Sequence, residues 1–192
     1  MRTPRFAFVP LFAGLVVSAV AAACKDREPT AASSSPRVLA AQQSSAGGSM
    51  AGVTIPPVGG FSSEVLSRSR FADDVDILFR IKMGHTMAVQ VDGSAGDVVM
   101  AKVTIQQGGA LPWHTHPGPA IVSVRTGELT IVRADGCTVH RYPAGSALID
   151  PGHGMVHAAF NSAASGATVL DVTYLDVPHG QSPLVPVPNP GC

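Results

Sequence analysis

Three histidines have the residue type and the spacing of a metal site. His114 and His116 lie two residues apart in the segment WHTHPG, and His157 follows the glycine-containing turn DPGHGM. On an extended strand alternate residues point to the same side, so the first two imidazoles would project together. Three imidazole nitrogens leave a divalent ion with open positions, and this ligand set suits Fe, Mn, Zn, Cu or Ni. The pattern therefore predicts one divalent metal ion held by all three histidines.

Two residues of the same turn could support this site. Asp150 and His153 lie shortly before His157, and either could provide a fourth ligand or a hydrogen bond to a coordinating imidazole. A turn-starting aspartate and a solvent-exposed histidine are the simpler interpretation, which stays open. The sequence contains no nucleophile–base pair, phosphate loop or dinucleotide fingerprint, so it names no catalytic residue. Three arginines on the expected strands are predicted to face solvent, with anion binding as an alternative that nothing in the sequence supports: Arg125, Arg133 and Arg141.

The segments that must position these histidines are short and rich in Val, Ile and Thr, as strands are. Turn-forming pairs separate several of them, including Gly108-Gly109, Thr126-Gly127 and Asp135-Gly136. No segment has the period of a convincing amphipathic helix, which favours an all-β sandwich or barrel. We predict strands at 98–106, 121–125, 128–133, 138–142, 147–150, 156–160 and 168–177, with outer strands at 64–71, 77–83 and 86–92.

Two motifs, in this order, make the chain resemble the cupin superfamily. In the first, Gly108 is followed by five residues and then by His114 and His116, and Gly127 occupies the place of the closing glycine. The second motif is matched with one extra residue between its proline and its turn glycine, by Gly145, Pro151, Gly154, His157 and Asn161. The resemblance implies a single cupin jelly-roll β-barrel that holds its metal through the motif histidines.

The first motif departs from the family pattern at one ligand. The family's glutamate would fall at position 120, where this chain has Ala120. The site therefore resembles the three-histidine cupins, a group that includes thiol dioxygenases and diketone-cleaving enzymes. Losing the carboxylate leaves an extra open position for water, oxygen or a chelating substrate. The resemblance implies a metal-dependent oxygenase acting on a small chelating molecule. A non-catalytic cupin that binds a small molecule or metal, and a structural barrel without metal, remain alternatives.

The N-terminal residues have the features of an export signal. Arg2 and Arg5 precede an apolar run at 6–20, too short for a comfortable transmembrane helix, and small residues then lead to Cys24. This predicts a signal peptide at 1–23, of the lipoprotein type with Cys24 as the lipid anchor, or a signal that is simply cleaved. The Ala/Ser/Gly-rich stretch at 24–60 is expected to be a flexible tether, and 61–192 the barrel domain with its Pro-rich tail.

The number of cysteines bears on the compartment of the protein, and the charge balance bears on its partners. If Cys24 carries lipid, Cys137 and Cys192 remain as a pair, which in a periplasmic or cell-surface location is expected to form a disulfide; two free thiols are the alternative. Lys+Arg and Asp+Glu balance at 13 each, so no nucleic-acid partner is expected. We expect a small-molecule ligand or substrate and membrane contact only through the lipid anchor. A homodimer is left open.

Overall fold

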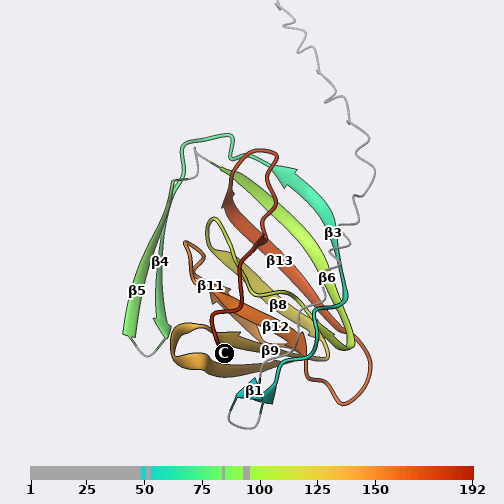
Figure 1. The fold of residues 1–192 in the computed structure, drawn as a ribbon. Helices are drawn as coiled ribbons and strands as arrows, with labels where there is room; N and C mark the ends of the chain where they lie inside the picture. Colours follow the sequence, from blue (N-terminus) through green and yellow to red (C-terminus); the bar gives the residue numbers. More distant parts are fainter. Residues whose placement is uncertain (1–48, 51–52, 84, 93–95) are drawn as a thin grey trace, which may run out of the picture. The chain divides into compact units, whose positions relative to one another are not determined.

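The computed structural model describes residues 49–50, 53–83, 85–92 and 96–192 (Figure 1). In these ranges every regular element is a strand, apart from one short 3-10 helix, η1 (Asp135–Cys137). The predicted signal peptide, Cys24 and most of the predicted tether lie outside the described residues. Among the helices of the described part, none is long and apolar enough to cross a membrane.

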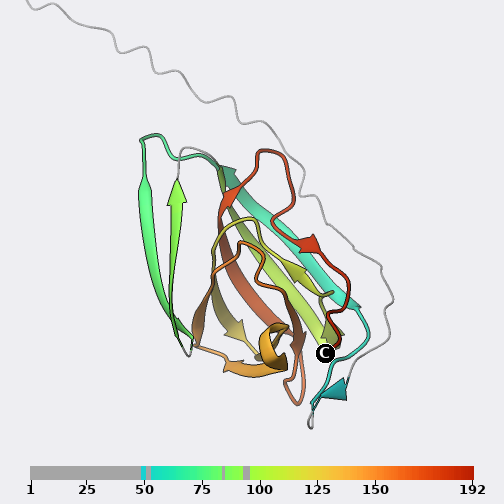
Figure 2. The same ribbon diagram turned by 60° about the vertical axis from the view of Figure 1, so that its left-hand side comes forward.

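The main sheet contains ten strands and curls into a barrel-like body (Figures 1 and 2). β3 (Gly59–Ser69) pairs with β6, and β7 (His114–Thr115) pairs with β12 and with β14 (Val185–Pro186). The central path runs in the order β10 (Thr138–Pro143), β9 (Glu128–Arg133), β12 (His157–Asn161), β6 (Asp97–Ala110), β13 (Thr168–Val177), β8 (Ala120–Thr126) and β11 (Ala147–Asp150). The all-β barrel predicted from the sequence is confirmed.

Alternation of apolar residues determines which face of each strand forms the core. Along β13, Leu170, Val172 and Tyr174 are buried while the residues between them are partly exposed, and β6 alternates in the same way. These side chains meet those of β8 and β9 in one apolar cluster inside the barrel. Each fully buried Val, Leu or Ile contributes on the order of 1.5–3 kcal/mol of transfer free energy, so this cluster holds the strands in register.

A second apolar cluster lies on the other face of β12. Trp113, Val132 and Phe160 are buried in it together with the chain's last residue, Cys192. The sulfur of Cys192 lies 2.17 Å from that of Cys137, so the structure joins the two cysteines that the sequence leaves as a pair. The C-terminal tail is thereby attached to the turn between β9 and β10.

Ordered structure begins before residue 61. β1 (Ser49–Met50) pairs with β2 (Val53–Thr54), and Ile55 is 4% exposed in the second cluster. β3 begins at Gly59. Part of the predicted tether is therefore packed on the barrel domain, and the exact extent of that tether stays a prediction.

One hairpin forms a separate two-stranded sheet beside the main sheet (Figures 1 and 2). It consists of β4 (Asp76–Met83) and β5 (His85–Asp92), which correspond to outer strands expected from the sequence. The inward positions of β5 are apolar, since Val89 and Val91 are buried. This hairpin forms one wall of a pocket described below.

Candidate metal centre

His114, His116 and His157 converge on one point. His114 is the first residue of β7, His116 follows directly after its end, and His157 begins β12 as the direct cross-strand partner of His114. The ring centroids of His114 and His157 are 4.2 Å apart, and one nitrogen from each of the three rings lies within 4.8 Å of the others. All three side chains are buried. The spacing of two residues thus places the imidazoles of His114 and His116 on the same side, as extended backbone requires.

A backbone carbonyl orients each ring. Nδ1 of His114 lies 2.7 Å from the oxygen of Pro112, and Nδ1 of His116 lies 2.7 Å from the oxygen of Pro183. Nδ1 of His157 lies 3.3 Å from the oxygen of Met155. A carbonyl oxygen can only accept, so each Nδ1 carries the proton and donates it, which leaves the lone pair on Nε2. The three Nε2 atoms are therefore the available ligands.

Burial keeps the three rings neutral. The pKa of His114 is lowered well below its usual value, first by burial and then by its proximity to the other two imidazoles. Burial also lowers the pKa of His116, and it lowers the pKa of His157 to about 3 with a further contribution from His116. Neutral imidazole is the form that binds a metal ion, so no deprotonation is needed at neutral pH.

The two candidate supporting residues have different positions. Oδ2 of Asp150 lies 3.4 Å from Nδ1 of His157, and its Oδ1 accepts a hydrogen bond from the backbone N–H of Gly152 at 2.8 Å. His153 is exposed, has a left-handed backbone with φ of 48°, and donates its backbone N–H to the oxygen of His116 at 3.0 Å. Asp150 is thus placed to orient an imidazole, whereas His153 supports the site only through its backbone.

The side chain at position 120, where the family pattern has a glutamate, faces the same side of the sheet as the histidines. Ala120 is fully buried and is the direct partner of Asp150 on β11 and of Tyr174 on β13. Direct partners on antiparallel strands present their side chains on one face, so all three point inward. The ring of Tyr174 lies 5.1 Å from that of His116, and burial, with a contribution from Asp150, raises the pKa of its phenol. Sequence reasoning missed Tyr174 because no local spacing links it to the histidines.

One of the three arginines does not face solvent as predicted. Arg125 pairs with Asp171 at 2.6 Å and Arg141 pairs with Glu128 at 3.3 Å, both at exposed positions. Arg133 is only 7% exposed, so the prediction was wrong for this residue. The reason is that β9 is buried on both faces over its last five residues, and alternation then gives no sign of which side is solvent.

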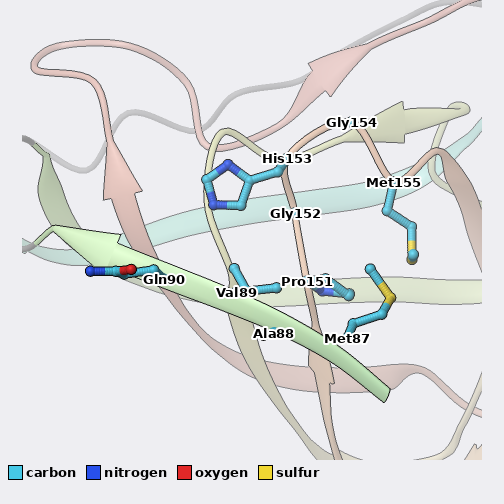
Figure 3. A pocket seen from close by; sticks show the side chains of 9 residues that line it. All are labelled: Met87, Ala88, Val89, Gln90, Pro151, Gly152, His153, Gly154 and Met155. Atoms are coloured by element: carbon cyan, nitrogen blue, oxygen red, sulfur yellow. The ribbon is translucent and has the colours of Figure 1, made fainter. Parts of the chain in front are cut away.

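A pocket of about 490 Å³ lies between β5 and the turn that precedes His157 (Figure 3). One wall is formed by residues 87–90 of β5 and the other by residues 151–155. Met87 and Met155 are directed toward each other from the two walls in Figure 3. The three histidines do not line this pocket, which adjoins their cluster only through the turn.

Comparison with known proteins identifies the fold family. Residues 101–173, which include all three histidines, match the family model described as Cupin domain. No curated protein matches the chain.

Several solved structures are similar to the chain at low identity. The polyketide cyclase RemF from Streptomyces resistomycificus is 16% identical over 68% of this chain and 72% of that one, with a TM-score of 0.41. An RmlC-like cupin from Shewanella frigidimarina is 14% identical over 62% of this chain and 79% of that one, with a TM-score of 0.40. An oxalate oxidase is 26% identical over 50% of this chain, with a TM-score of 0.38, and the alignment spans about half (48%) of its length. None of these similarities assigns an activity, whereas the family match identifies residues 101–173, the part of the barrel that carries both histidine motifs, as a cupin domain.

Proposed function

We propose that this protein is an exported cupin that holds one divalent metal ion through His114, His116 and His157. We further propose that it acts as a metal-dependent oxygenase on a small molecule that chelates the ion. The observation that carries the proposal is the convergence of three buried imidazoles whose Nδ1 atoms all face oxygen acceptors. Within the described part of the chain, all the hydrogen bonds of these three rings are made through Nδ1, which leaves the Nε2 lone pairs available.

The donor set fits such an ion. Three neutral nitrogen ligands, without a carboxylate among them, suit Fe, Mn, Zn, Cu or Ni and leave coordination positions open. When bound, an ion with open positions would supply Lewis-acid or redox chemistry to a chelating substrate.

The surrounding residues have roles that follow from their contacts. The carboxylate of Asp150 beside His157 favours the proton on Nδ1 and makes Nε2 of that ring a stronger donor to a metal. Tyr174 remains protonated because burial raises its pKa, so its hydroxyl can donate a hydrogen bond to a ligand near His116. The apolar side chains of the inner cluster keep bulk water away from the imidazoles.

Export is part of the proposal and is supported by the sequence features of residues 1–24. A periplasmic or cell-surface location, with attachment through Cys24, would also suit a pair of cysteines placed to form a disulfide. In that setting we expect the partner to be a small molecule, with the lipid anchor as the link to a membrane.

A non-catalytic binding protein is the second candidate. It is favoured by the pocket between β5 and the turn at 151–155, which has Met87 on one wall and Met155 on the other but does not include His114, His116 or His157. A small molecule held there would not need chemistry at a metal ion.

Metal analysis and oxygen uptake test the proposal together. The mature protein, His157→Ala and a control His140→Ala are compared by elemental analysis and then loaded with iron anaerobically. The wild type and the control are expected to hold about one ion per chain and to consume oxygen with small chelators such as 2-mercaptocarboxylates or 1,3-diketones. Equal metal content in His157→Ala would refute the site. Tight metal binding without oxygen uptake with any chelator would favour the binding protein.

A further inference from the structure

Arg133 has a buried charge with no partner in the described part of the chain. The residue is 7% exposed, and its Nε atom makes no hydrogen bond. Among the described residues Arg133 forms no ion pair, whereas Arg125 on β8 and Arg141 on β10 each contact a carboxylate. Burying an unpaired charge is unfavourable for folding. Such a residue is commonly kept where function uses its charge at the expense of stability.

Cross-strand pairing places Arg133 beside the metal-binding imidazoles. His157 on β12 has His114 of β7 as its partner on one side and Arg133 of β9 as its partner on the other. Direct partners on antiparallel strands present their side chains on the same face, with Cβ atoms about 5 Å apart. His114, His157 and Arg133 therefore form one row on the inner wall of the barrel.

The charge balance of this row favours an anion. The nearby carboxylate of Asp150 already contacts the backbone N–H of Gly152 and Nδ1 of His157. Position 120, where the family places a glutamate, is Ala120. A divalent ion at the histidines would make the excess of positive charge larger still.

We propose that Arg133 is the anion-binding residue of this site and that the substrate is a small carboxylate. The carboxylate group would pair with the guanidinium while a neighbouring oxygen or sulfur atom of the same molecule binds the metal. The planar guanidinium matches a carboxylate through two parallel hydrogen bonds, which gives both affinity and orientation. This inference rests on the proposed function for the metal, but the role of Arg133 can be tested separately.

The test uses matched ligands and matched variants. The probes are lactate and 2-mercaptoacetate, each compared with its uncharged amide, which keeps the chelating group and removes the carboxylate. Wild type, Arg133→Met, Arg133→Lys and the exposed control Arg125→Met are loaded with Co²⁺, whose visible spectrum reports changes in its ligands. Metal content is measured first, and ligand affinity is then obtained by calorimetric titration.

The expected result separates ligand binding from metal binding and folding. Arg133→Met should keep its Co²⁺ but bind the carboxylates at least about tenfold more weakly, because a charge-assisted hydrogen-bonded pair is lost. Arg133→Lys should be intermediate, Arg125→Met should match the wild type, and amide binding should be the same in all four proteins. The melting temperature of Arg133→Met should equal or exceed that of the wild type, because an apolar side chain removes an unpaired buried charge.

Several outcomes would overturn the inference. Equal carboxylate affinity in wild type and Arg133→Met, or no preference of the wild type for carboxylates over amides, would show that Arg133 does not bind the ligand. A large fall in melting temperature for Arg133→Met would show that the arginine has a structural role instead. If the wild type holds no Co²⁺, the proposed function fails. The inference is then tested on the metal-free protein: carboxylate binding that is lost in Arg133→Met supports it, and binding that is unchanged or absent overturns it.

Discussion

Nδ1 of His116 lies 2.7 Å from the carbonyl oxygen of Pro183, a residue 67 positions later in the chain. Pro183 belongs to the proline-rich tail that follows β13. Within this tail β14 pairs with β7, the strand that begins at His114 and directly precedes His116. Because the tail ends at Cys192, which is joined to Cys137, the disulfide and the metal site are connected through one segment.

Loss of the disulfide should weaken metal binding. In Cys192→Ser the tail loses its attachment to Cys137, so the carbonyl of Pro183 would no longer hold His116 firmly. A bridge over a sequence separation of 55 residues contributes on the order of 4 kcal/mol to stability, and supporting contacts to a ligand change metal affinity about 10- to 100-fold. Competition titration with a metal chelator measures the effect.

Reductant provides the control for that variant. Reduced wild type should match Cys192→Ser, and the variant itself should not respond to reductant. Non-reducing peptide mapping of the exported protein must first show the linked peptides. Free alkylation of both cysteines without prior reduction would contradict the disulfide.

Restoring a carboxylate at position 120 should strengthen the metal site. The side chain of Ala120→Glu would point inward between Asp150 and Tyr174, the cross-strand partners of Ala120. We expect tighter retention of Mn or Fe, and a lower melting temperature in the absence of metal because the new charge is buried. Ile121→Glu is the matched control, since Ile121 is exposed on the opposite face. Identical metal binding in Ala120→Glu and the wild type would show that position 120 does not reach the ion.

The stability of the apoprotein should decrease as the pH falls below about 6.5. The unfolded chain binds protons on its histidines near that pH, whereas the folded rings remain neutral because their pKa values are lowered, that of His157 to about 3. Each such ring then changes the free energy of unfolding by about 1.4 kcal/mol per pH unit in this window. Urea unfolding between pH 8 and pH 5 measures the slope, and His157→Ala should reduce it. A slope that is equal in the variant would contradict the lowered pKa.

Asp97, the first residue of β6, should contribute to the stability of the fold. Its carboxylate accepts hydrogen bonds from Arg68 at 2.7 Å and Arg70 at 3.0 Å and lies 3.2 Å from Nδ1 of His179. Burial raises the pKa of Asp97, but these three partners outweigh burial and lower it to about 2. The contribution is therefore present above the usual aspartate pKa of 3.8 and is lost as the pH falls toward 2.

Replacing that carboxylate measures its contribution. Asp97→Asn should reduce the free energy of unfolding at neutral pH by about 3 kcal/mol, because it leaves two arginines around an uncharged group. Asp171→Asn is the control, since its pair with Arg125 is exposed and should contribute less than about 1 kcal/mol. Equal losses of unfolding free energy for the two substitutions in chemical denaturation would show that the Asp97 cluster contributes no more than an exposed ion pair.

Local pattern was sufficient for the long strands of the barrel and for placing His114 and His116 side by side. Alternating apolar residues predicted the strands at 98–106 and 168–177, which lie within β6 and β13. The two-residue spacing of His114 and His116 required only that the segment be extended. The two motifs then identified His157 as their partner, because a resemblance to a family supplies the long-range pairing that periodicity lacks.

Only the tertiary structure determined which residues lie beside the three histidines. Arg133, Tyr174 and Pro183 come from β9, β13 and the tail, and each reaches the histidines through strand pairing or a hydrogen bond over a long sequence separation. Strand register decides which residues become neighbours across a sheet, and it depends on the packing of the whole barrel. A strand such as β9, buried on both faces, has no alternation from which the orientation of Arg133 could be predicted.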